Sequence, residues 1–153
     1  MTRIQNPTIQ IPSERLDQIK AIGAALGTQS IADTIGHLVR AEIERGTIPD
    51  TLPGISISKA GDTVMLALDD DLPVRMTQDR AKELAQIVLD YADGTERVQK
   101  LMNMDSAALD STYVIARQGN GIKLTIPLKD GTTKSFSRDV ARDFARILDA
   151  AAA

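Results

Sequence analysis

The chain has 153 residues, of which 42% are hydrophobic and 25% charged, and its formal net charge is -3. This composition is typical of a soluble globular protein and excludes a largely disordered chain. The absence of cysteine excludes disulfides and thiolate sites, and the single histidine, His37, argues against a catalytic triad or a multi-histidine metal site. No apolar run approaches the ~18 residues of a membrane helix, and the start lacks the apolar core of a signal peptide, so we expect a cytoplasmic protein without membrane contact.

The first 46 residues predict a strand followed by two helices. Residues 8–12, TIQIP, alternate polar and apolar side chains and end in a proline. Ser13 and Gly27 bracket one helical apolar pattern, and Ser30 and Gly46 bracket a second. A lone strand and two helices bury too little apolar surface, so we expect a homodimer with paired antiparallel strands and a shared four-helix core. That dimer core would comprise Ile9, Ile11, Leu16, Ile19, Ile35, Leu38 and Val39.

Three stretches of this segment resemble the ribbon-helix-helix repressors, the family of Arc and MetJ. They read TIQIP, SERLDQIKAIGAALG and SIADTIGHLVRAEIERG. The resemblance covers residues 4–46 and implies an intertwined dimer that inserts a two-stranded β-ribbon into the major groove of double-stranded DNA. One departure is visible, because Gly27 and Ser30 are separated by one residue more than in Arc.

The resemblance also implies which side chains contact DNA. Asn6, Thr8 and Gln10 would point outward together and read bases, since amide side chains pair with adenine and threonine offers a hydroxyl and a methyl group. Phosphates would bind at the start of the second helix, where free amides and the helix dipole attract anions. The expected phosphate contacts are Arg3, Thr28, Gln29 and Ser30. Few lysines and arginines are present here, so we expect modest affinity per dimer.

The remainder of the chain consists of a linker and a repeated pattern. Residues 47–54 are rich in proline and glycine and predict a linker. Residues 55–91 and 113–151 then match each other, and each copy predicts a β-hairpin, a short third strand and a capped helix. The expected turns are Gly61-Asp62 and Asn120-Gly121, and the expected caps are Thr77 and Ser137. The alternating strand positions expected to point inward are Val64, Leu66, Leu68, Ile122, Leu124, Ile126 and Leu128. One copy could scarcely bury a core, so we expect the two to pack with pseudo-twofold symmetry as one α+β domain, residues 55–153. Residues 95–112 between them are expected to be partly helical.

Charge is distributed unevenly over this domain. Residues 55–94 carry four basic and eight acidic side chains, whereas residues 113–153 carry seven basic and four acidic ones. The basic side chains of the second copy form either a solvated face or a second nucleic-acid surface; they are Lys123, Lys129, Lys134, Arg138, Arg142 and Arg146. The acidic run at residues 69–71 lacks the glycine and glutamate that complete an EF-hand, so an acidic loop is favoured over a cation site.

The sequence predicts no enzyme, cofactor or metal site, because it contains no paired catalytic carboxylates, phosphate loop or nucleophile elbow. It predicts a dimeric, sequence-specific transcriptional repressor in which residues 55–153 mediate oligomerisation, contact with a protein partner or response to a ligand. The alternative is an antitoxin, or a plasmid partition or DNA-transfer accessory protein. Antitoxin tails that fold only on binding differ from the self-sufficient pattern of residues 55–153.

Overall fold

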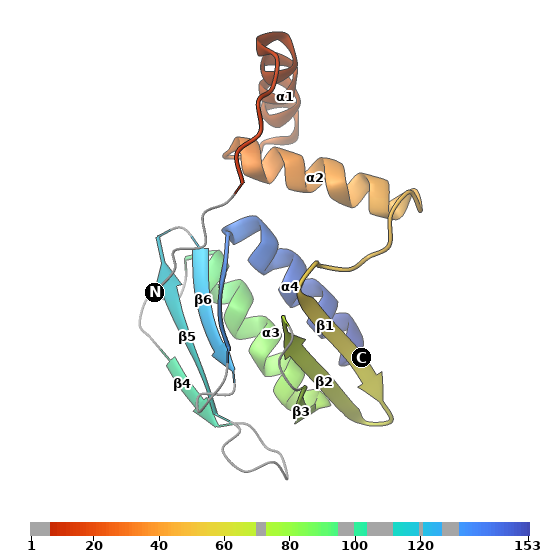
Figure 1. The fold of residues 1–153 in the computed structure, drawn as a ribbon, viewed down its shortest axis with the longest axis vertical. Helices are drawn as coiled ribbons and strands as arrows, with labels where there is room; N and C mark the ends of the chain where they lie inside the picture. The colour runs from red at the N-terminus through yellow and green to blue at the C-terminus, as the bar shows by residue number, and fades with distance from the viewer. Residues whose placement is uncertain (1–6, 70–72, 95–99, 104–111, 120, 127–131) are drawn as a thin grey trace. The chain divides into compact units, whose positions relative to one another are not determined.

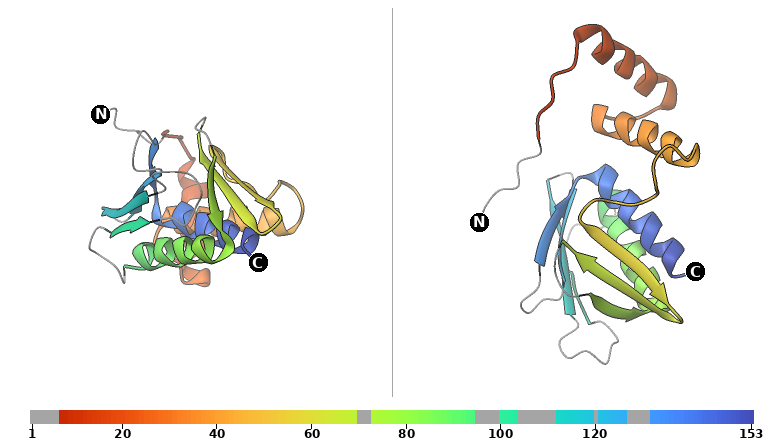
Figure 2. Two further views of the ribbon diagram at one scale, coloured as in Figure 1. Left: turned by 90° about the horizontal axis from the view of Figure 1, so that it is seen from below. Right: turned by 45° about the vertical axis from the view of Figure 1, so that its right-hand side comes forward.

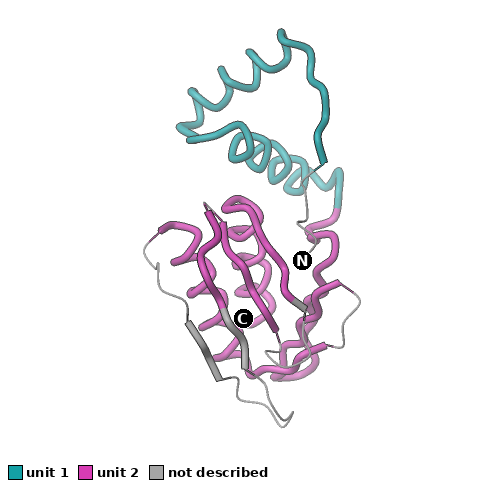
Figure 3. Tube along the Cα trace, turned by 60° about the vertical axis from the view of Figure 1, so that its left-hand side comes forward, with its two compact units in different colours: residues 1–48 teal, residues 49–153 magenta. Residues whose placement is uncertain are grey.

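Figure 1 shows the fold of the protein in a computed structural model. The structure describes residues 7–69, 73–94, 100–103, 112–119, 121–126 and 132–153. Contacts within the chain divide it into two compact units, which we call unit 1 (Met1–Ile48) and unit 2 (Pro49–Ala153) and which Figure 3 colours teal and magenta. Two helices form the described part of unit 1, and two antiparallel sheets, each followed by a helix, form unit 2. The chain is therefore α+β.

Unit 1 consists of helix α1 (Ser13–Leu26) and helix α2 (Ile31–Glu44). Helix α1 begins after Pro12 without a side-chain cap, so Ser13 is the first helical residue rather than the expected cap. The helix ends as expected at Gly27, whose φ of 73° is the left-handed conformation that glycine adopts without strain. Helix α2 has the expected cap, because the Ser30 hydroxyl accepts a hydrogen bond of 3.1 Å from the Asp33 amide.

The predicted ribbon-helix-helix fold is wrong. Residues 7–12 form no strand, and unit 1 consists of two helices after an extended segment. A strand needs a neighbour for its backbone N–H and C=O groups, and within the described part of the chain no strand pairs with this segment. The spacing of aliphatic residues on which the resemblance depended predicts the two helices correctly, but that spacing is common to many helix pairs.

The first repeat of unit 2 is a three-stranded antiparallel sheet followed by a helix. Strands β1 (Ile55–Ala60), β2 (Thr63–Leu68) and β3 (Val74–Thr77) lie in that order, and helix α3 (Gln78–Ala92) follows directly. The turn between β1 and β2 is the predicted one, with Gly61 at a φ of 66°. Thr77 caps α3 as expected, since its hydroxyl accepts from the amide of Arg80 at 3.2 Å.

The second repeat has the same order of elements. Strands β5 (Thr112–Gln118), β6 (Gly121–Ile126) and β7 (Thr132–Phe136) precede helix α4 (Arg138–Ala151). Ser137 caps α4 as predicted.

The turn between β5 and β6 lies one residue earlier than predicted. Gln118 pairs with Gly121, and the positive φ belongs to Gly119, the equivalent of Gly61 in the first repeat. Gly121 instead begins β6, where an added Cβ would lie 2.0 Å from the carbonyl oxygen of Phe136. This glycine is therefore required for the close approach of two backbones.

The predicted helix between the repeats is absent where the structure describes this region. Strand β4 (Lys100–Asn103) pairs antiparallel with β5 and makes the second sheet four-stranded, and residues 95–99 and 104–111 lie outside the described residues. The open edge of β5 offers backbone partners to this segment, and these partners outweigh its local helix preference.

Helices α3 and α4 pack side by side, and both sheets cover them (Figures 1 and 2). The inward positions follow the alternation read from the sequence: Val64, Leu66, Leu68, Ile122, Leu124 and Ile126 are all at most 2% exposed. The rings of Phe136 and Phe144 stack within this core with their centroids 5.3 Å apart. Across the described residues, we find no helix with the length and apolar character to cross a membrane.

Candidate functional site

The extended segment at residues 7–12 exposes the side chains that the sequence singles out as base readers. Thr8 and Gln10 are both exposed, and Asn6 and Arg3 lie outside the described residues. Ile9, expected in a dimer core, is 72% exposed, while Ile11 is half-buried. Within the single chain, this segment therefore presents polar and apolar side chains to solvent alike.

A compact set of hydroxyl groups joins the end of α1 to the start of α2. The hydroxyls of Thr28 and Thr34 lie 2.6 Å apart, and Thr34 also donates to the carbonyl oxygen of Ser30 at 3.0 Å. Thr34 is only 1% exposed, and its hydroxyl lies 2.6 Å from the position that a Cβ on Gly23 would take. Thr28, predicted to hold a phosphate, thus already has a hydrogen-bond partner within this junction.

The electrostatics at the start of α2 are less favourable to anions than a bare helix end. Gln29 and Ser30 are exposed, as a phosphate contact requires. Asp33, however, lies in the first turn and is 7% exposed, so its carboxylate occupies the positive end of the helix dipole. A phosphate at this end would have to approach that charge, which lowers the expected affinity.

The cations of unit 1 are few, and two of them are engaged with neighbouring side chains. Arg15 donates to Gln18 at 2.9 Å, and Arg45 pairs with Glu42. A hydrogen bond from the Thr47 hydroxyl, together with the charge of Arg45, lowers the pKa of the Glu42 carboxyl. Residues 1–48 carry five basic and five acidic side chains, so unit 1 has no net charge with which to attract DNA over a distance.

The large apolar side chains of unit 1 remain accessible. Those predicted for a dimer core include Ile35, Leu38 and Val39 on α2, which are 38%, 38% and 40% exposed. Leu16 and Ile19 on α1 are half-buried. Ile22 and Leu26, at 37% and 51%, are exposed apolar residues that the predicted core omits although their helical spacing was visible in the sequence.

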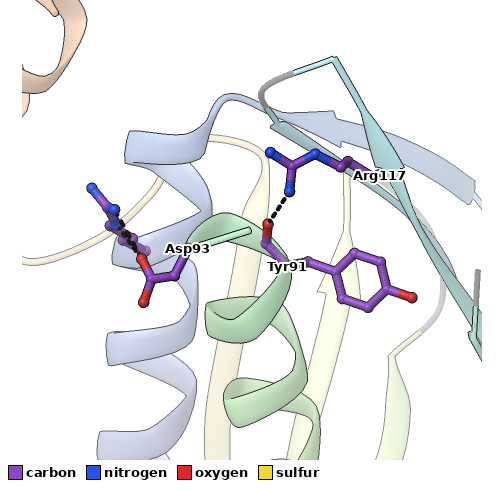
Figure 4. A network of polar contacts seen from close by, with 4 residues as sticks. Tyr91, Asp93 and Arg117 are labelled. Carbon is purple, nitrogen blue, oxygen red and sulfur yellow. Dashed lines mark hydrogen bonds and ion pairs between the residues drawn. The ribbon is translucent and has the colours of Figure 1, made fainter. Parts of the chain in front are cut away.

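In unit 2, the acidic and basic parts of the sequence meet in ion pairs. Arg142 binds Asp93 with 2.8 Å between Nη2 and Oδ1. Arg117 donates to the carbonyl oxygen of Tyr91 at 3.1 Å, and Figure 4 shows this contact near Asp93. The Arg117 guanidinium thereby lies at the negative end of the α3 dipole, where a cation is stabilising.

Two further pairs connect distant segments of unit 2. Lys134 on β7 binds Asp69 after β2 at 2.7 Å, and Arg146 on α4 binds both carboxylate oxygens of Asp50 at 2.8 Å. The bidentate contact with Arg146 lowers the pKa of Asp50. Three of the basic side chains expected on a solvated face or a nucleic-acid surface are thus engaged with carboxylates, and Lys129 lies outside the described residues.

The other candidate ligand sites have few features that would bind a ligand. A groove of about 190 Å³ between α3 and α4 is lined by Ala85, Leu89, Arg142 and Arg146 among others, and is smaller than the ~300 Å³ from which ligand pockets usually start. His37 is exposed on α2. Asp69 of the acidic run is paired with Lys134, and no cluster of metal-ligating side chains occurs among the described residues.

Comparison with known proteins shows little similarity. No family model matches the sequence, and no curated protein matches it either. Among solved structures, the chain is similar to a protein of unknown function from the DUF155 family of Prochlorococcus sp. NATL2A, at 10% identity and a TM-score of 0.37. The alignment covers 65% of this chain and 94% of that one. Such a likeness carries no argument about function.

Proposed function

We propose that the protein is a non-enzymatic, cytoplasmic, sequence-specific DNA-binding repressor that acts as a dimer, with unit 1 as its DNA-contacting part. Residues 55–153, within unit 2, serve oligomerisation, partner contact or ligand response. A β-ribbon takes no part in this function, because residues 7–12 form no strand. DNA contact is assigned instead to the extended segment at residues 7–12, acting as an arm, and to the start of α2.

The observation that carries the proposal is the exposure of Thr8 and Gln10 on an extended segment that has no strand partner within the described chain. Extended arms preceding a helical unit are one way in which proteins enter a DNA groove. Glutamine can pair with adenine, and threonine can contact a thymine methyl group, so this pair of side chains suits base recognition.

Charge limits the strength of the proposed binding. Unit 1 carries no net charge, and Asp33 lies at the start of α2, so few counterions would be released for each dimer bound. We therefore expect moderate affinity with weak salt dependence, and a specificity that depends on side-chain hydrogen bonds. Tight non-specific binding would contradict this charge distribution.

The test is selection of binding sites from random DNA duplexes by the full chain at two salt concentrations. We expect an enriched motif for the native protein and its loss in the double variant Thr8→Ala, Gln10→Ala, because each good base contact is worth ~1–3 kcal/mol of discrimination. Gln86→Ala, which removes an exposed glutamine from α3 of unit 2, is the matched control and should leave the motif intact. An unchanged motif in the double variant, or no enrichment by the native chain, would refute the proposal.

A further inference from the structure

Unit 1 buries almost nothing of its own. Four of its described residues are buried, namely Gly23, Asp33, Thr34 and Gly36, and none of them has a large apolar side chain. The contact between α1 and α2 is made by a glycine and by the hydroxyls of Thr28 and Thr34. The junction is therefore close and polar, and every leucine, isoleucine and valine of the two helices is left half-buried or exposed.

Those apolar residues form stripes at helical spacing, which we call the apolar stripes of unit 1. On α1, Ile22 and Leu26 are four residues apart, and on α2, Ile35, Leu38 and Val39 lie at the spacing of one helix face. All five are between 37% and 51% exposed. Two helices of this length cannot remain folded in water with their apolar faces uncovered, so the stripes require a partner.

We infer that a second copy of this chain covers the apolar stripes, so that α1 and α2 of two copies share one core. The distribution of apolar side chains in the chain favours this partner. All seven exposed large apolar residues among those the structure describes belong to unit 1, and unit 2 offers none. The surface of this chain that can match the stripes is thus the same surface on another copy, as in an isologous dimer.

Charge allows two such faces to meet. Residues 1–48 carry equal numbers of basic and acidic side chains, so two copies of unit 1 approach without net repulsion. The inference rests on the proposed function in one respect, since it names the surface through which the regulator becomes a dimer. It does not depend on DNA.

The test is the mass of the full chain in solution, measured by light scattering or sedimentation equilibrium. We expect twice the 16.5 kDa of one chain. Leu38→Lys places a charge within the α2 stripe and should weaken dimerisation by a factor of about 100 or more. Ile48→Lys is the matched control, because Ile48 is similarly exposed at 44% but follows both helices. The dissociation constant of the dimer should be the same for this variant as for the native chain.

A second measurement covers the case in which Leu38→Lys fails to fold. The chain has no cysteine, so the single variant Leu38→Cys gives one reactive thiol, which a bis-maleimide should link into covalent dimers. Ser58→Cys on β1 of unit 2 is exposed and should remain uncrosslinked. Monomers for the native chain, or equal crosslinking of both cysteine variants, would overturn the inference, as would a dimer that Leu38→Lys leaves intact.

These outcomes separate the inference from the proposed function. A dimer that enriches no DNA motif would refute DNA recognition and leave the shared core standing. A monomer that still selects a motif would refute the shared core and leave DNA recognition standing. The double variant Thr8→Ala, Gln10→Ala should change the selected motif without changing the mass.

Discussion

The two units of this chain differ in how much of their apolar surface they bury. Unit 2 encloses a core between two sheets and two helices, with Leu66, Leu84, Leu124 and Phe144 all fully buried. Unit 1 has helices of nearly the same length, but no large apolar side chain in its described part is buried. In unit 2, the second repeat packs against the first within one chain. Unit 1 has no such internal copy.

A helical pattern in sequence thus specifies an apolar face of the helix but not the element that covers it. The stripes on α1 and α2 have the spacing of core helices, as do those on α3 and α4. In unit 2, α3 and α4 cover each other although they begin 60 residues apart along the same chain. In unit 1 we infer that they belong to another molecule.

The largest expected contrast is between core substitutions in the two units. Phe144→Ala removes a fully buried ring that stacks on Phe136, so it should destabilise unit 2 by about 3–5 kcal/mol. Leu38→Ala, in dilute protein, should leave the stability of unit 2 unchanged. Urea unfolding followed by circular dichroism measures both, and a loss of unit 2 stability from Leu38→Ala would break the separation between the units.

The next effect is a dependence of stability on protein concentration. If two copies share a core in unit 1, a hundredfold increase in protein concentration should stabilise its helices by about 2.7 kcal/mol, while the unfolding of unit 2 stays where it was. Amide hydrogen exchange at two protein concentrations distinguishes the backbone amides of α1 and α2 from those of unit 2. Protection in α1 and α2 that is independent of concentration would contradict a shared core.

A smaller effect is expected at the junction of α1 and α2. Gly23→Ala places a methyl group 2.6 Å from the Thr34 hydroxyl, so it should destabilise unit 1 by ~1–3 kcal/mol, measured by thermal unfolding at fixed concentration. The Thr28 hydroxyl lies 2.8 Å from the same position, so the change should cost less in a background with both Thr28→Ala and Thr34→Ala, where the two nearest atoms are gone. Equal costs in both backgrounds would show that the close approach is not what requires glycine.

The smallest effect concerns the ion pair between Asp50 and Arg146. Arg146 lowers the pKa of Asp50 in the folded state, so the pair stabilises unit 2 above the unfolded pKa of about 3.9, and this contribution is lost as pH falls through the lower folded value. Both side chains are more than two-fifths exposed, so Asp50→Asn should cost no more than about 0.5 kcal/mol at neutral pH. Denaturant titrations at neutral and acidic pH test it, and an equal cost at both would exclude the charge as its origin.

Local signals in the sequence were sufficient for most elements of unit 2. The match between the repeats, the alternation around Leu66 and Leu124, and the caps Thr77 and Ser137 depend on neighbours a few residues away, so pattern reading recovered them. Strand β4 was missed because its partner β5 supplies the stabilising hydrogen bonds. The ribbon-helix-helix prediction failed similarly, since a strand at residues 8–12 would depend on pairing with another chain, and no strand of the described residues pairs with this segment.

The ion pairs of unit 2 were not predicted from the sequence. The opposite net charges of residues 55–94 and 113–153 are visible there, but the basic side chains of the second copy were expected on a solvated face or a nucleic-acid surface. Which charges would meet depended on the register of the strands and on the packing of α4. The pairing of Arg142 with Asp93 therefore became visible only in the folded chain.

Local spacing and composition were enough to specify the helices, the hairpins, the repeat and the absence of cysteine chemistry. Three features became visible only in the folded chain: residues 7–12 have no strand partner among the described residues, β4 extends the second sheet, and unit 1 leaves its apolar stripes uncovered. The physical reason is the same in each case. Burial and sheet pairing are properties of two surfaces, and one sequence segment specifies only one of them.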